Sequence, residues 1–238
     1  RIERGYKEPY NVKYWSLGNE FGYGHMEGDN TAAGYGKNGK RYGKKMLEVS
    51  PDLVLCSSGP YPKWEWAEQS ARQRMEVAPM VAMHSYVAQP FFMEKEQYEE
   101  DYYECIDKVD TQCRKLVHQM REELGDDRLR ISFDEWNVWF HSNAADDDIT
   151  ENHPWQVAPP MLEDIYNFED ALLVGLMLIT LIKHADRVKM ACLAQLVTVI
   201  APIMTDAAGG LWKQTILYPF MHVSNYVRRV SLLPIITR

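Results

Sequence analysis

Two glutamates stand in short, unusual sequence frames that lie far apart along the chain. Glu20 closes the run Tyr-Trp-Ser-Leu-Gly-Asn-Glu, and Glu135 is the third residue of Phe-Asp-Glu-Trp-Asn-Val-Trp. Each follows an apolar run, residues 12–17 and 129–133, that predicts a buried strand. Barrel enzymes keep their chemistry at the C-terminal ends of parallel strands. The pair therefore suggests an acid and a nucleophile that act on one glycosidic bond.

Apolar periodicity predicts strands and helices in alternation along the chain. The predicted strands cover residues 12–17, 53–57, 80–86, 129–133 and 188–193. The predicted helices cover residues 31–49, 64–75, 94–124, 168–184 and 213–229. Strands of Val, Ile, Leu and Met without polar alternation are typical of parallel sheets buried on both faces. We therefore expect an α/β fold.

Periodicity alone does not choose between a closed barrel and an open, doubly wound sheet. No GxGxxG or GxxxxGK[ST] loop follows any predicted strand, and this weakens the nucleotide-binding version. Five strand–helix units are visible where a closed barrel of this type has eight. We expect the first three strands to precede Arg1, and residues 231–237 to begin another module.

Composition limits the class of partner. A chain of 238 residues, with 46% hydrophobic and 25% charged residues, suits one large globular domain. A net charge of −8 argues against a nucleic-acid surface, which needs clustered Lys and Arg. An aromatic content of 12% suits a sugar-binding cleft, because ring faces stack on the C–H faces of sugars. Core packing would account for the same rings equally well.

Cysteine spacing and apolar run length bear on cofactors and compartment. The cysteines are Cys56, Cys105, Cys113 and Cys192. They form no CxxC pair and no Cys/His ligand spacing, which predicts free thiols and no metal site. Reduced thiols favour the cytoplasm, although secretion stays open. The apolar stretch 171–182 is too short to span a bilayer. The acidic run 146–148 lacks the ligand spacing of a calcium loop, so we expect residues 146–148 to form a solvated loop.

The residues around both glutamates resemble glycoside hydrolase family 51, the α-L-arabinofuranosidases, a retaining family built on the TIM barrel. The similar segments are 11–20, 84–86, 132–139, 183–188, 191–197, 200–203 and 212–215. This resemblance covers nearly the whole chain. It implies a (β/α)8 TIM barrel of which about strands 4–8 are present. Residues 1–229 would be the catalytic barrel portion, and residues 230–238 the start of a C-terminal β-sandwich.

The resemblance also implies roles for the carboxylates. Glu20 would be the general acid/base and Glu135 the nucleophile of a double displacement. Asn19 would bind the sugar 2-hydroxyl, a contact that strengthens in the transition state. Asp134 could compete with Glu135, but neighbours along a strand point to opposite faces, so only one of them would face the barrel axis. We choose Glu135.

Four further residues are expected around the sugar. By resemblance, Tyr86 would orient Glu135, Trp139 would form a wall of the subsite, and Gln195 would contact the sugar from the last strand. His84 could be a metal ligand or an acid/base. A single His without a second ligand at the right spacing more often supports a pocket through hydrogen bonds, and we assign His84 that role.

The leading hypothesis is a retaining hydrolase that releases terminal non-reducing α-L-arabinofuranosyl groups from arabinan, arabinoxylan or their oligosaccharides. It would need no cofactor, and its partner would be an arabinose-containing saccharide, with no nucleic acid or membrane involved. Family members often form homo-oligomers. Related enzymes of the clan cleave β-xylosides or β-glucans, so a β-xylosidase or endo-glucanase is one alternative. An inactive fragment that binds sugar, or that needs a complementary chain, is the other.

Overall fold

A computed structural model of the chain describes residues 1–58, 64–87, 129–139, 143–157, 161–228 and 230–232, with single positions 107, 110, 111, 114, 115, 118, 122 and 159. Most of the predicted helix 94–124 lies outside the described residues, as do Cys105 and Cys113. Because residues 233–238 are also outside them, the boundary expected at residue 229 and the β-sandwich that would follow it stay predictions.

The described elements alternate in type along the chain. In order they are η1 (Ile2–Arg4), β1 (Tyr14–Leu17), α1 (Ala32–Val49), β2 (Val54–Ser57), α2 (Trp64–Arg74), β3 (Met80–Val87), β4 (Arg130–Val138), α4 (Asn143–Asn152), α5 (Phe168–Lys183), β5 (Val188–Leu193), β6 (Ile203–Thr205), β7 (Leu211–Lys213) and α6 (Leu217–Tyr226). All five predicted strands are present within a few residues of their expected positions.

One five-stranded sheet has the order β1-β2-β3-β4-β5, and β6 and β7 form a separate antiparallel pair. The β1–β2 and β2–β3 pairs are parallel, with Tyr14 opposite Val54 and Cys56 opposite Met80. Parallel neighbours in chain order require a crossover connection, and α1 and α2 supply these connections. The predicted α/β class is confirmed.

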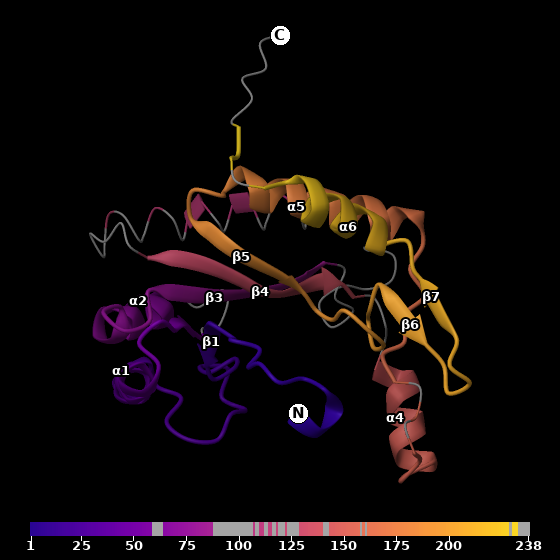
Figure 1. The fold of residues 1–238 in the computed structure, drawn as a ribbon, viewed down its shortest axis with the longest axis horizontal. Coiled ribbons are helices and arrows are strands. Elements are labelled where there is room, and N and C mark those ends of the chain that lie inside the picture. Colours follow the sequence, from indigo (N-terminus) through magenta and orange to yellow (C-terminus); the bar gives the residue numbers. More distant parts are fainter. Residues whose placement is uncertain are drawn as a thin grey trace. The chain divides into compact units, whose positions relative to one another are not determined.

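The chain divides into two compact units. The first contains the described residues of Arg1–Met83 and Gln119–Ser132, and the second those of His84–His118 and Phe133–Arg238. In the first unit α1 packs on α2 (Figure 1). A Cβ on Gly36 of α1 would come within 3.0 Å of the Ser70 carbonyl oxygen, so glycine permits this close approach.

Both ends of α1 agree with the sequence signals. Thr31 is the N-cap, and its side chain accepts a hydrogen bond from the Gly34 N–H at 3.0 Å. Ser50 is the C-cap, directly before Pro51, which cannot continue a helix. Local chemistry was therefore sufficient to predict both limits of this helix.

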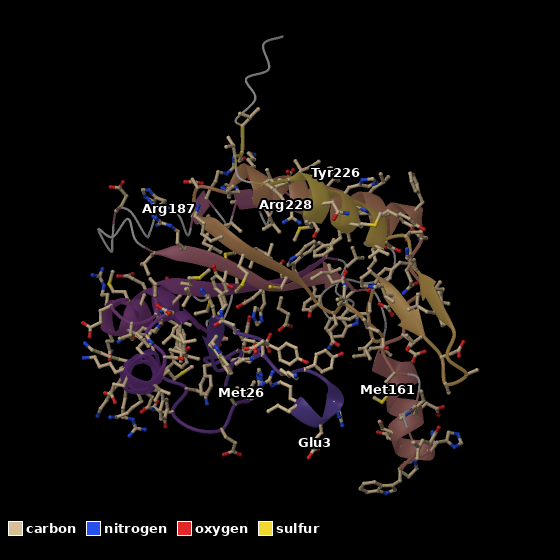
Figure 2. All side chains as sticks on the ribbon, viewed as in Figure 1. Glu3, Met26, Met161, Arg187, Tyr226 and Arg228 are labelled. Atoms are coloured by element: carbon tan, nitrogen blue, oxygen red, sulfur yellow. The ribbon has the colours of Figure 1, made fainter. Side chains whose placement is uncertain are left out.

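In the second unit α5 lies beside α6 (Figure 1). Asn167 caps α5 by accepting from the N–H groups of Glu169 and Asp170, and the Asp170 carboxylate accepts from the Asn167 N–H. At the end of α6, Arg228 donates to the Ser224 carbonyl oxygen at 2.7 Å, so it satisfies a terminal helix carbonyl (Figure 2).

Three elements differ from expectation. Residues 146–148 belong to helix α4 and not to a loop, so that prediction is wrong. Within this helix Asp148 accepts a hydrogen bond from the Asn152 side chain one turn later. The predicted helix 213–229 begins only at Leu217, because Leu211–Lys213 form strand β7. Strand β4 extends to Val138, so Glu135 lies inside it.

The β6–β7 hairpin has no counterpart among the predicted elements. Its strands have three residues each, too few for a periodic signal. The residues of the turn explain why a hairpin forms here. Asp206 Oδ1 accepts from the N–H groups of Ala208 and Gly210, and Gly209 has φ 88°.

Cys56 and Cys192 are free thiols; Cys56 is buried, as expected of these thiols, whereas Cys192 is exposed. Partial burial, together with the nearby Asp134 carboxylate, raises the pKa of the Cys192 thiol, which disfavours the reactive thiolate. Among the helices that the structure describes, none has the length and apolar character that a bilayer crossing requires.

Candidate active site

In the first unit, Glu20 lies in a tight turn just after β1. Its own φ is 51° and that of Gly18 is 93°, both in the left-handed region. A Cβ on Gly18 would come within 2.7 Å of the Phe21 ring, so this position requires glycine. Asn19, the expected ligand of the sugar 2-hydroxyl, is exposed in the same turn.

Helix α1 and strand β2 hold this turn in place. The Tyr35 hydroxyl donates to the Leu17 carbonyl oxygen at 2.8 Å and accepts from the Ser58 N–H at 2.7 Å. Ser58 Oγ in turn accepts from the Phe21 N–H at 3.0 Å. The ends of β1 and β2 are therefore tied together directly beside Glu20, which positions its backbone.

The described ion pair of the Glu20 side chain is with His25. Oε2 lies 3.6 Å from Nε2 of His25, and the two side chains are 27% and 54% exposed. An ion pair this open to solvent contributes little free energy. The carboxylate is accessible, and it can exchange a proton with a group that approaches from solvent.

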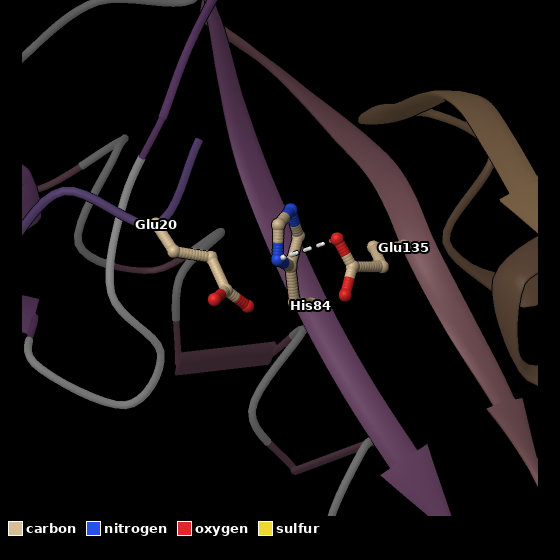
Figure 3. Close-up of side chains that lie close together, drawn as sticks. All are labelled: Glu20, His84 and Glu135. Atoms are coloured by element: carbon tan, nitrogen blue, oxygen red, sulfur yellow. Dashed lines mark ion pairs between the residues drawn. The ribbon is translucent and has the colours of Figure 1, made fainter. Parts of the chain in front are cut away.

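In the second unit, Glu135 on β4 is held by two side chains from β3. The Tyr86 hydroxyl donates to Oε1 at 2.8 Å. His84 Nδ1 lies 3.4 Å from Oε2, and this ion pair is drawn in Figure 3, which also labels Glu20. Because each carboxylate oxygen has its own partner, the rotation of the carboxylate is fixed. The expected support of Glu135 by Tyr86 and His84 has a geometric basis here.

Asp134 also reaches His84. Its Oδ1 lies 3.2 Å from Nε2 of the ring, so the imidazole lies between two carboxylates, and the ring is only 8% exposed. Strand alternation therefore does not separate Asp134 from Glu135 as expected, because the two ring nitrogens point in different directions and each meets a different carboxylate. What distinguishes the two acids is the additional hydrogen bond from Tyr86 to Glu135.

Trp139 braces Tyr86 from the end of β4. The two rings are 5.1 Å apart at an interplanar angle of 70°, an edge-to-face arrangement. The backbone N–H of Trp139 donates to the Val87 carbonyl oxygen at 2.9 Å, which holds the ends of β4 and β3 together. The indole is half-buried beside Tyr86.

Gln195 is exposed in the segment that follows β5. Its preceding residue is anchored to β4, because the Ala194 N–H donates to the Trp136 carbonyl oxygen at 3.0 Å. Asn137 also bonds to this segment. It belongs to the sequence frame around Glu135, but that frame predicts no separate role for it.

An imidazole and a carboxylate are also ligands that zinc accepts. The expectation that the site holds no metal stays a prediction.

This chain is similar to known arabinofuranosidases. Residues 134–238 match the family described as the α-L-arabinofuranosidase C-terminal domain. An intracellular exo-α-(1→5)-L-arabinofuranosidase of Acetivibrio thermocellus is 44% identical over 99% of this chain and 48% of its own length. The enzyme of the same name from Halalkalibacterium halodurans is 46% identical over 98% of this chain and 47% of its own length. The chain thus spans about half the length of the curated relatives it matches.

Solved structures agree with these relatives. A family 51 α-L-arabinofuranosidase from Bifidobacterium longum superimposes with a TM-score of 0.79 at 29% identity, covering 95% of this chain and 47% of that one. An arabinofuranosidase from Xanthomonas axonopodis, at 22% identity and a TM-score of 0.75, shares the fold. The predicted fold class is confirmed: the chain is about half of an α/β barrel.

Proposed function

Since this chain resembles glycoside hydrolase family 51 over nearly its whole length, we propose that it carries both catalytic carboxylates of a retaining α-L-arabinofuranosidase. The substrate would be a terminal non-reducing α-L-arabinofuranosyl group on an arabinan, an arabinoxylan or their oligosaccharides. The observation that carries the proposal is Glu135, a strand carboxylate whose two oxygens are oriented by Tyr86 and His84. The names of the relatives, exo-arabinofuranosidases described as intracellular, support this substrate and a cytoplasmic site of action.

In the first chemical step, Glu135 attacks the anomeric carbon. A bond forms between a carboxylate oxygen and that carbon while the glycosidic C–O bond breaks, and its electron pair passes to the leaving oxygen. Glu20 donates the proton that this oxygen needs. Tyr86 and His84 restrict the rotation of Glu135, so that the attacking lone pair is already aimed and little entropy is lost in the transition state.

In the second step, water resolves the glycosyl–enzyme ester. Glu20, now a carboxylate, takes a proton from the water as the water attacks the anomeric carbon, and the bond to Glu135 breaks. Two inversions give net retention. Retaining enzymes of this kind use two carboxyl groups about 5–5.5 Å apart. Glu20 follows β1 and Glu135 lies on β4, and barrel enzymes place catalytic groups at the carboxyl ends of their strands.

Sugar binding completes the proposal. Asn19 would donate to the 2-hydroxyl, where charge develops as the ring approaches an oxocarbenium ion. Trp139 would offer its half-buried indole as a wall for the sugar ring, a use of aromatic faces that needs no charge. Gln195 would contact the sugar from the segment after β5.

The test uses a panel of 4-nitrophenyl glycosides with the intact protein that contains this chain. We expect the α-L-arabinofuranoside to be hydrolysed fastest, with an initial product of the same anomeric form by NMR. A 2-fluoro-arabinofuranosyl inhibitor with a good leaving group should label Glu135, and mass spectrometry of peptides would locate the label. Dominant hydrolysis of the β-D-xyloside would favour the xylosidase alternative. Sugar binding without any hydrolysis would favour the inactive fragment.

A further inference from the structure

Asn137 is a fully buried amide on β4, two residues after Glu135. Its Nδ2 group donates to the Ala194 carbonyl oxygen at 2.7 Å and to the Ile200 carbonyl oxygen at 2.6 Å. Its Oδ1 atom accepts from the Val138 N–H at 2.8 Å, which fixes the orientation of the amide. A single side chain therefore binds both ends of the segment 194–200.

This segment has a backbone that needs external support. Thr198, Val199 and Ile200 have φ values of 61°, 28° and 43°, so three consecutive non-glycine residues lie in the left-handed region. All three residues are β-branched, and such residues are disfavoured in this region and persist only where surrounding contacts determine the conformation. The contacts are present: the Ile200 N–H donates to the Leu162 carbonyl oxygen at 2.7 Å, while Asn137 holds the Ile200 carbonyl.

The segment is fixed at its ends and open to solvent between them. Ile200 is 5% exposed, whereas Leu196 and Val197 are 55% and 45% exposed, and Gln195 is exposed beside the anchored Ala194. Gln195 therefore depends on the anchoring of its neighbour for its position. No hydrogen bond of the Gln195 side chain to the described residues replaces that anchor.

We propose that Asn137 is a positioning residue that fixes the segment 194–200 and, through it, places Gln195 for sugar binding. This inference rests on the proposed function, in which Gln195 contacts the substrate. Glu135 and Asn137 lie on the same strand, so the strand that carries the nucleophile also holds the segment that carries a sugar contact. A shift of the segment would then appear as weaker substrate binding and not as a loss of the nucleophile.

The chemistry of the site requires an amide. A carboxylate would place negative charge against two carbonyl oxygens, and an apolar side chain would leave both buried carbonyls without donors. A serine could donate to only one carbonyl. The structure therefore orders the variants by the number of bonds that remain, with Asn137→Ser milder than Asn137→Ala.

The experiment combines kinetics with a double-mutant cycle in the intact protein. We expect Asn137→Ala to raise KM for 4-nitrophenyl α-L-arabinofuranoside by about tenfold with a smaller change in kcat, equivalent to the loss of roughly one hydrogen bond to the substrate. Gln195→Ala should raise KM by a similar factor. The double variant should be no worse than Asn137→Ala alone, because Gln195 is already displaced there. Asn137→Ser should give an intermediate KM.

A second measurement reports the segment directly. Amide hydrogen exchange in residues 194–200 should accelerate by about tenfold or more in Asn137→Ala and less in Asn137→Ser. The matched control is Asn167→Ala, which removes the N-cap of α5 in the same unit and should lower stability while leaving KM and this exchange unchanged.

The proposal would be overturned if the KM of the double variant rose by the product of the two single-variant factors. It would also be overturned if hydrogen exchange in residues 194–200 stayed unchanged in Asn137→Ala. An unchanged KM in Gln195→Ala would do the same. A wild-type protein without arabinofuranosidase activity would instead reject the proposed function, and the exchange data would still show whether Asn137 holds the segment.

Discussion

Glu20 and Glu135 are held in opposite ways. Glu135 lies within a strand, and each of its oxygens has a partner from the neighbouring strand, Tyr86 or the nearly buried His84. Glu20 lies in a turn beyond its strand, and its described ion pair is with His25, a half-exposed side chain at 3.6 Å. Both oxygens of Glu135 have a buried or part-buried partner, whereas the described ion pair of Glu20 is open to solvent.

The difference matches what each role would demand. A nucleophile keeps one charge state and one direction of attack, so a fixed rotamer with two partners serves it. A general acid/base must gain and lose a proton once per turnover and must meet first a leaving oxygen and then a water. Firm partners on both of its oxygens would compete with those transfers. Four substitutions would sharpen or break this contrast.

The largest effect is expected for Glu135→Ala. Without the nucleophile, kcat on arabinosides should fall by at least about 10⁴-fold. Azide should restore part of the rate by entering the vacated space, and it should give a product of inverted configuration, which NMR would detect. Asp134→Ala provides the control, because Asp134 contacts His84 but has no proposed role in bond making; the loss of kcat should be far smaller. Equal losses in the two variants would show that the nucleophile is wrongly assigned.

Glu20→Ala should have the next largest effect, and one that depends on the leaving group. Hydrolysis of natural arabino-oligosaccharides should fall by about 10²–10⁴-fold, since their leaving alcohols need protonation. The rate of the first step with a dinitrophenyl arabinoside should be nearly unaffected. The burst of released dinitrophenolate would be visible by stopped flow. A uniform loss on both substrates would contradict an acid/base role for Glu20.

Tyr86→Phe tests the rigidity of Glu135 alone. It removes a hydrogen bond to a charged oxygen, and kcat should fall by about 10–100-fold, which corresponds to the usual strength of such bonds. Trp139 should keep the Phe ring in place through the edge-to-face contact. Tyr42→Phe, on the exposed surface of α1, is the matched control and should leave kcat unchanged. A wild-type kcat in Tyr86→Phe would remove the case for a fixed nucleophile.

The smallest effect is expected for His25→Ala. Solvent-exposed ion pairs contribute little, so kcat should change by less than about threefold at neutral pH. The pH dependence of kcat/KM would be measured alongside. A large change in the alkaline limb would mean that His25 controls the protonation of Glu20, and the contrast between the two carboxylates would then need revision.

Local signals in the chain predicted much of this molecule. The five strand segments, the limits of α1 and the start of α5 depend on neighbours within a few residues, so local patterns were enough to predict them closely. The frames around Glu20 and Glu135 marked both carboxylates in the same way, before any contact was known.

Contacts between distant parts of the chain decided the rest. The sharing of His84 by Asp134 and Glu135 depends on how two strands about 50 residues apart pair, and Asn137 reaches across 57 and 63 residues to its carbonyl partners. Strand alternation describes one strand at a time, so it could not place two adjacent carboxylates around one ring. The sequence by itself determined which side chains bring chemistry to this protein, because side-chain type is local. Only tertiary structure decided which of them are held rigid, because that depends on partners brought near by folding.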